Sequence, residues 1–139
     1  MNGIKYGAYH SNIAWGLFLE NWNISPPTPR RHKVYIPGRH GSLDVSKALT
    51  GELFYEDRTL TANFVMLGDR EEWPGRYSEI LQAIHGKEMN IYPDEDPDYF
   101  YFGFCEVTDF KMGKTHATIT IQADVIPFKL EIAGNGAKL

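Results

Sequence analysis

The sequence predicts a mainly β domain, a β-sandwich or split barrel of antiparallel strands with one α-helix near residues 74–86. Apolar and polar residues alternate in several short runs, the pattern of half-buried strands, whereas a helical period occurs in one segment. Aromatic residues make up 14% of the chain, and such a composition favours strands. At 139 residues the chain can bury roughly two-thirds of its unfolded surface, enough for one self-sufficient core.

The first predicted strand covers residues 16–24, where Leu17, Leu19, Trp22 and Ile24 supply the apolar positions. A cluster of three prolines in residues 25–29 ends it, because proline cannot continue a ladder of hydrogen bonds. We interpret this cluster as a rigid connector; a proline-rich recognition ligand is the alternative.

A hairpin is predicted next, because two turn signals lie directly against short apolar segments. The turns are Pro37-Gly38 and His40-Gly41-Ser42, and the flanking apolar residues are Val34, Ile36, Leu43 and Val45.

Two further strands are predicted at residues 53–55 and 59–67. The second has a period of two, which buries one face and leaves the other in water. Its predicted buried face is Leu60, Ala62, Phe64 and Met66, and its predicted polar face is Thr59, Thr61 and Asn63.

The predicted helix has apolar residues at helical spacing: Trp73, Tyr77, Ile80, Leu81 and Ile84. Pro74 suits a first helical turn, and Gly86 suits the end. We expect the apolar stripe to pack on the sheet rather than to bind a partner.

The remaining strands are predicted at residues 89–92, 99–109 and 117–125, with the acidic segment 93–98 as a hairpin tip. The last strand alternates over nine residues. We divide the chain into a β domain, residues 1–132, and a segment 133–139 that is either a flexible tail or the start of a C-terminal domain that this chain lacks.

Charge and cysteine content exclude several classes of protein. The net charge of −4 offers no basic surface for phosphates, so tight nucleic-acid binding is not expected. The single cysteine, Cys105, cannot form an internal disulfide, and no Cys/His cluster has the spacing of a zinc site. No apolar run of about 18 residues exists to cross a bilayer, so we expect no membrane insertion by this chain.

Asp94, Asp96 and Asp98 match the first three ligand positions of a calcium loop. The match ends there, because Tyr99 and Cys105 stand where the loop needs glycine and glutamate. We therefore predict a solvated acidic tip and no metal site.

No motif predicts catalysis or a cofactor. Gly38-Arg39-His40-Gly41 lacks the Lys-Ser/Thr ending of a phosphate-binding loop, and the five histidines are far apart in the sequence. No G-x-S-x-G elbow is present. We expect no enzymatic activity; a small enzyme of unrecognised type is the third hypothesis.

The run Tyr99-Phe100-Tyr101-Phe102-Gly103-Phe104 is the densest aromatic segment. Alternation places rings on both faces of its strand, one set in the core and the other outward. The outward set suits either a sugar platform or a subunit contact. We favour the contact, with Tyr99 and Tyr101 as interface candidates; a monomeric carbohydrate-binding module is the alternative function.

Three segments together resemble siphophage distal tail proteins, and they occur in the order and spacing of that family. They are Ile-Pro-Gly-Arg-x-Gly-Ser-Leu-Asp at residues 36–44, Ala-Leu-Thr-Gly-Glu at residues 48–52 and Tyr-Glu-x-Arg-Thr-Leu at residues 55–60. Further likeness extends over about residues 15–129.

The resemblance implies a structural virion protein related to tail tube domains, made in the host bacterial cytoplasm. Its members form a hexameric ring that joins the tail tube to the tail tip or baseplate hub and leaves a channel for DNA. The implied partners are five further copies of the chain, the tail tube protein and the hub protein; the tape measure protein is a further candidate, and DNA only passes through.

Charged residues of the shared segments are the other interface candidates: Arg39, Asp44, Glu52 and Arg58. Their charges can pair within a subunit or across the ring. Members of the family commonly carry a second β-sandwich domain, and this chain ends about where it would begin. The chain is either a short version or a truncated one, and adhesin attachment and carbohydrate binding, which depend on that domain, stay open for it.

Overall fold

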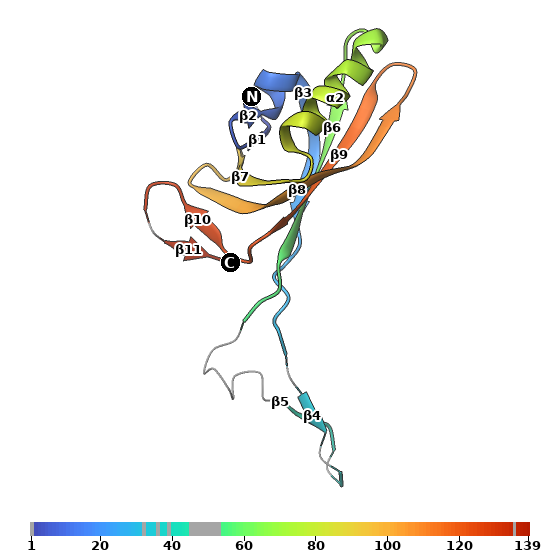
Figure 1. Ribbon diagram of the computed structural model, residues 1–139. Helices are drawn as coiled ribbons and strands as arrows, with labels where there is room; N and C mark the ends of the chain where they lie inside the picture. The colour runs from blue at the N-terminus through green and yellow to red at the C-terminus, as the bar shows by residue number, and fades with distance from the viewer. Residues whose placement is uncertain (1, 32, 36, 39, 45–53, 135) are drawn as a thin grey trace.

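The computed structural model describes residues 2–31, 33–35, 37–38, 40–44, 54–134 and 136–139 (Figure 1). One large curled sheet forms the body. Its strands are β1 (Ile4–Tyr6), β2 (Tyr9–His10), β3 (Leu17–Ile24), β6 (Arg58–Met66), β7 (Lys87–Pro93), β8 (Tyr99–Met112) and β9 (Ala117–Val125). They lie in the order β2-β1-β7-β8-β9-β6-β3, and each neighbouring pair is antiparallel.

The core lies on one face of this sheet. Burial alternates residue by residue along β6 and β9, so the predicted period of two in both strands is confirmed. The predicted buried face of β6, from Leu60 to Met66, is fully buried, and Thr59, Thr61 and Asn63 lie on the opposite face. We call that opposite face, on β3, β6, β9 and β8, the solvent face.

The predicted helix is confirmed as α2 (Trp73–Ile84), preceded by the 3₁₀ turn η1 (Arg70–Glu72). Trp73, Ile80 and Ile84 are buried, so the apolar stripe packs on the sheet as expected. The helix ends at Ile84, two residues earlier than predicted, with His85 as its C-cap, and Gly86 adopts φ +77° to turn the chain into β7.

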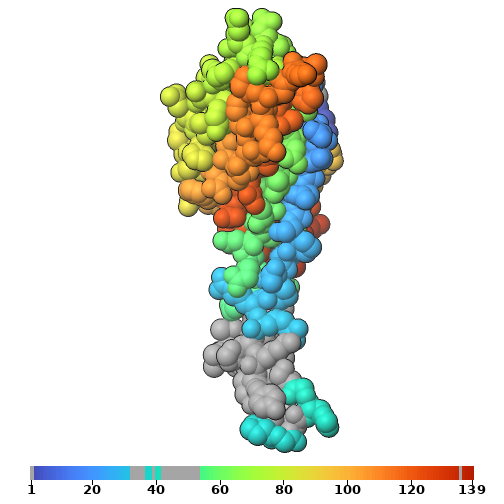
Figure 2. Space-filling view, turned by 90° about the vertical axis from the view of Figure 1, so that its right-hand side faces the viewer, coloured from blue at the N-terminus to red at the C-terminus, as the bar shows by residue number. Residues whose placement is uncertain are grey.

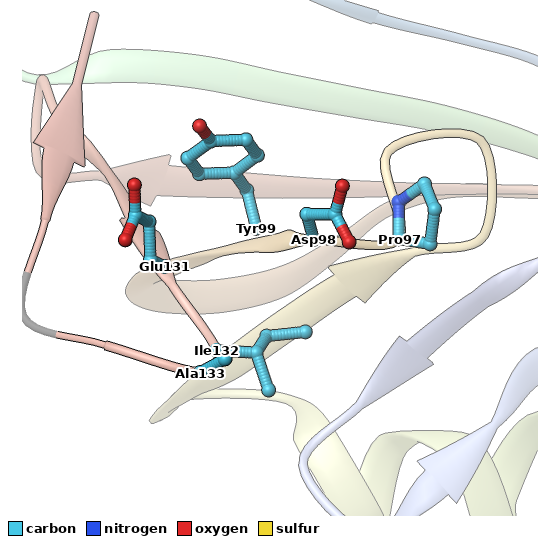
Figure 3. A pocket seen from close by; sticks show the side chains of 6 residues that line it. All are labelled: Pro97, Asp98, Tyr99, Glu131, Ile132 and Ala133. Carbon is cyan, nitrogen blue, oxygen red and sulfur yellow. The ribbon is translucent and has the colours of Figure 1, made fainter.

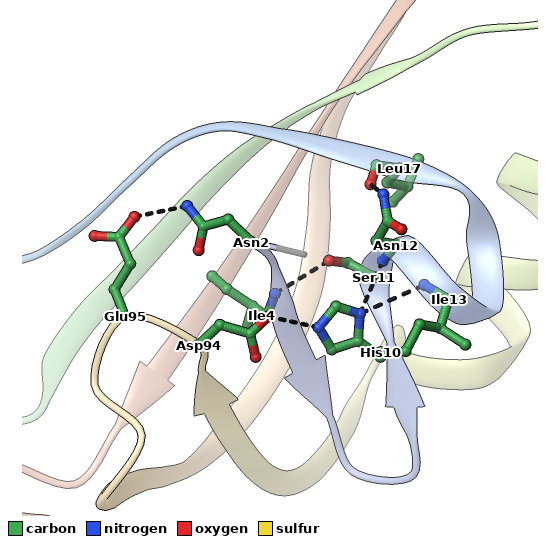
Figure 4. A network of polar contacts seen from close by, with 9 residues as sticks. All are labelled: Asn2, Ile4, His10, Ser11, Asn12, Ile13, Leu17, Asp94 and Glu95. Carbon is green, nitrogen blue, oxygen red and sulfur yellow. Dashed lines mark hydrogen bonds and ion pairs between the residues drawn. The ribbon is translucent and has the colours of Figure 1, made fainter.

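A second helix, α1 (Ser11–Trp15), and the hairpin β1-β2 were not predicted. They are too short to show a period in the sequence. Tertiary contacts hold them instead: the His10 ring caps α1, and Gly16 ends it with φ +66° (Figure 4).

The described parts of residues 25–57 form a long arm that extends from the end of the body opposite α2 (Figure 1). Near its root, the Arg30 amide donates to the Phe54 carbonyl at 2.6 Å, and the Glu56 amide donates to the Thr28 carbonyl at 2.7 Å. Further out, β4 (Lys33–Tyr35) pairs with β5 (Ser42–Asp44), which confirms the predicted hairpin.

Part of the region that carries the shared motifs lies outside the described residues, including the segment 48–52 and Leu53 of the predicted strand 53–55. Tyr55 forms one isolated bridge with Pro29.

The C-terminal segment forms a small hairpin that was not predicted. β10 (Lys129–Glu131) pairs with the start of β8 and with β11 (Ala137–Lys138). Among the described residues, no helix is long and apolar enough to cross a membrane.

Candidate functional site

Of the four charged interface candidates, Arg39 and Glu52 lie outside the described residues, and Asp44 is the last residue of β5. Their part in a subunit contact stays a prediction.

Arg58, at the start of β6, is 8% exposed and binds within its own chain. Its Nε donates to the Ser25 carbonyl at 2.8 Å and its Nη1 to the Pro127 carbonyl at 3.4 Å. The guanidinium also lies 6.0 Å from the centre of the Tyr101 ring. Arg58 thus joins the ends of three strands, and its role in a subunit contact stays a prediction.

The two tyrosine candidates differ in burial. Tyr101 is 3% exposed and belongs to the core; burial raises its pKa, against the opposing charges of Lys129 and Arg58. Tyr99 is half-buried, with the ammonium of Lys129 at 4.4 Å and that of Lys138 at 5.5 Å from its ring centre. These contacts fix Tyr99 against the β10-β11 hairpin.

Tyr99 also borders a hollow of about 390 Å³ beside that hairpin (Figure 3). The other lining residues are Pro97, Asp98, Glu131, Ile132 and Ala133. The apolar side chain of Ile132 in this lining is 51% exposed. The lining also contains two carboxylates, those of Asp98 and Glu131. The lining mixes acidic and apolar groups without a set of polar atoms that converge on one point.

The three aspartates of the acidic tip have different surroundings and do not meet at one point. Asp94 accepts from His10 Nε2 at 2.8 Å, Asp96 pairs with Lys129 at 2.8 Å, and Asp98 lines the hollow. In the described part of the chain no group of three metal-ligating side chains forms a site for a cation. Cys105 is buried, and burial raises the pKa of its thiol to about 12.

The solvent face is polar at its middle. Asn63 Nδ2 donates to Asn21 Oδ1 at 2.6 Å, and Thr120 Oγ1 donates to Asn63 Oδ1 at 2.8 Å, so a ladder of side chains crosses β3, β6 and β9. These three strands run side by side in Figure 2. Glu106 and Asp109 of β8 extend the same face in register with Gln122 and Thr120. Neutral hydrogen-bonding groups and carboxylates thus cover its middle, whereas Phe18, Val65 and Lys111 lie in one row with Thr118 on the same face.

Towards the arm, the solvent face becomes a groove that is both aromatic and acidic. We call it the acidic groove, a hollow of about 360 Å³ lined by Asp57, Glu88, Phe102, Gly103, Phe104, Asp124 and Ile126. Phe104 is 42% exposed and Ile126 36%. Of the outward rings of β8, Phe100 packs on Tyr92, with ring centres 5.3 Å apart, and the other two face this groove.

Among the described residues, β3 and β8 have the longer unpaired edges of the sheet, and β2, the strand at its other end, has two residues. β3 is the last strand of the sheet, and its outer edge has no partner strand. β8 pairs with β7 only up to Cys105, so residues 106–112 have β9 on one side and no described strand on the other. Such edges favour pairing with another chain.

These features define a mostly antiparallel β sheet, curled into a half-barrel and accompanied by few helices, with open edges and a polar face. No family model matches the chain, and no curated protein matches it. Among solved structures, its fold is similar to the crystal structure of the Dit (gp 19.1) protein of phage SPP1, described as a paradigm of the hub adsorption apparatus in phages that infect Gram-positive bacteria.

This similarity has a TM-score of 0.72 at 16% sequence identity and covers 94% of the chain. The chain spans about half of the Dit protein, 52% of its length. The fold class predicted from the sequence, mainly antiparallel β with few helices, is thereby confirmed.

Proposed function

We propose that the protein is a structural subunit of a phage tail, a distal tail protein whose six copies form a ring between the tail tube and the tail tip. The observation that carries this proposal is the similarity of almost the whole chain to the Dit fold. The motifs at residues 36–60, which resemble distal tail proteins, support it independently.

The open edges of the sheet supply a route to ring closure. A head-to-tail contact joins two different patches of neighbouring subunits, and rings close when the rotation between them is right. The outer edge of β3 and the edge of β8 at residues 106–112 are two such patches. Pairing them would continue one sheet around the ring and remove both exposed edges.

The solvent face suits the wall of the resulting channel. Asn21, Asn63 and Thr120 offer neutral polar groups, while Glu106 and Asp109 carry negative charge. Like charge disfavours adsorption of DNA, so a genome can pass without sticking. Tail tube protein, hub protein and tape measure protein are the expected neighbours, and no reaction or cofactor is proposed.

The mass of the particle in solution tests the proposal. Six copies of 15.9 kDa give about 95 kDa by light scattering, if necessary after addition of the tail tube and hub proteins from the same phage. A particle that stays at 15.9 kDa at high concentration, and also with those neighbours, contradicts it.

A further inference from the structure

The acidic groove lacks a positive partner within the described chain. Phe104 lies in register between Glu88 of β7 and Asp124 of β9, so a partly exposed ring has a carboxylate on each side. Asp57 adds a third carboxylate to the same hollow. No cation pairs with any of the three among the described residues, and like charges this close repel one another.

Such a groove fits one kind of side chain. Phe102, Phe104 and Ile126 offer apolar surface to an aliphatic stem, and the carboxylates offer hydrogen-bond acceptors to a cationic head. Arginine meets both demands, because its guanidinium binds carboxylates through a planar fork and also stacks on aromatic faces. DNA and acidic segments are disfavoured by the same charges.

The chain carries its complement on the arm. Residues 28–41 contain four Lys or Arg and no Asp or Glu, whereas the rest of the chain has ten basic and eighteen acidic residues. Arg30 and Arg31, at the root of the arm, are exposed. Arg30 pairs with Glu56 at 3.3 Å, but both side chains are more than half exposed. Replacing Glu56 by another carboxylate as the partner of Arg30 therefore costs little free energy.

Rotation about the axis of a ring does not change the position of a residue along that axis, so equivalent residues of all copies lie at the same height. The groove and the root of the arm lie close together along the molecule: Asp57 lines the groove, and Phe54, three residues before it, bonds to Arg30. In a ring, the arm root of one copy is therefore level with the groove of its neighbour.

From this complementarity we infer that the acidic groove of each subunit binds the Arg30–Arg31 segment of a neighbouring copy. The contact adds a second, side-chain interface to the edge pairing, and it rests on the proposed ring. Arg30 of the neighbour offsets part of the negative charge of the three carboxylates and covers Phe104, while the arm remains attached to its own subunit.

Two single-cysteine substitutions test this directly. Asp124→Cys places a thiol in the groove and Arg30→Cys places one on the arm root, while the buried native Cys105 does not compete. The variants are purified separately, mixed and oxidised, and the products are separated by mass without reductant. Mixtures of each with Glu71→Cys, on the exposed η1 turn at the other end of the body, are the controls.

A disulfide-linked dimer that requires both Asp124→Cys and Arg30→Cys, at a yield at least several times that of the controls, is the expected result. Absence of this dimer in a sample whose mass is that of a ring overturns the inference and leaves the proposed function intact. A dimer of two Asp124→Cys copies overturns it as well, because the grooves would then face each other. A sample that remains monomeric overturns both.

Discussion

His10 and Asp94 are joined by a hydrogen bond, with the imidazole Nε2 2.8 Å from the carboxylate Oδ2 (Figure 4). The other ring nitrogen, Nδ1, accepts hydrogen bonds from the amides of Asn12 and Ile13 at 3.2 and 3.4 Å. A nitrogen that accepts carries no proton, so Nε2 is the donor to Asp94. One side chain thereby caps α1 and ties it to the loop between β7 and β8.

Removal of the His10 side chain should destabilise the subunit. His10→Ala loses the helix cap and the bond to Asp94, and we expect the free energy of unfolding to fall by about 1–2 kcal/mol in urea titration. His10→Asn keeps a side-chain oxygen that can cap the helix, so its free energy of unfolding should fall by less than that of His10→Ala. The control is His116→Ala, at an exposed position, with a change within about 0.5 kcal/mol. Equal effects of the two alanine substitutions would contradict this role of His10.

At Gly103 the backbone of β9 leaves no room for a side chain on β8. A Cβ there would lie 2.1 Å from the Asp124 carbonyl oxygen, so the backbone must shift. We expect Gly103→Ala to lower the free energy of unfolding by about 3 kcal/mol, the upper end for overpacking. Gly75→Ala is the matched control, because open space surrounds that position in α2; it should raise stability by about 0.5 kcal/mol. Similar effects at both glycines would show that the close approach does not constrain the strand.

Replacement of Arg58 separates a role in the fold from a role between subunits. Arg58→Met removes the donors to the Ser25 and Pro127 carbonyls, and we expect a loss of about 2–3 kcal/mol in the free energy of unfolding. Lys111→Met, at a side chain that is 77% exposed, should change it by less than about 0.5 kcal/mol. A variant of Arg58 that unfolds like the parent but no longer assembles would place this arginine in the subunit contact instead.

Cys105 should be unreactive in the folded protein. Burial raises the pKa of its thiol to about 12, so the thiolate fraction at pH 8 is on the order of 10³ lower than for a free cysteine. A thiol reagent should therefore label the protein only after denaturation. Because the folded pKa is raised, this group favours folding at neutral pH, and its contribution declines as pH rises above about 9. Rapid labelling of the native protein would contradict the burial of this thiol.

The polar middle of the solvent face should control the passage of DNA. Glu106→Lys combined with Gln122→Lys places two cations in register on this face, and we expect ejection of DNA from assembled phage to slow. Glu71→Lys combined with Gln82→Lys, at two exposed positions of η1 and α2, is the control, because it raises the net charge by the same three units. Unchanged ejection kinetics in the double variant would remove this face from the channel wall.

Periodicity predicted the long elements well. β6, β9 and α2 carry one face or stripe of apolar residues over nine or more positions, so the spacing of these residues predicts which side chains are buried. The short elements could not be predicted in this way. α1 has five residues and depends on the His10 ring, and β10-β11 depends on the contacts of Tyr99 with Lys129 and Lys138.

The surfaces were harder to predict than the core. Tyr101 was expected to face outward and is buried, because the inward set of rings in residues 99–104 includes it. The acidic groove was missed, since Asp57, Glu88 and Asp124 are far apart in sequence and meet only through the register of β7, β8 and β9. Cross-strand register is the information that a single sequence lacks.

Electron microscopy of the purified protein, alone and with its tail tube and hub neighbours, tests the central claim most directly. The account predicts annular particles with six-fold symmetry and an open centre. Compact particles of single subunits, without an annulus under either condition, would contradict it.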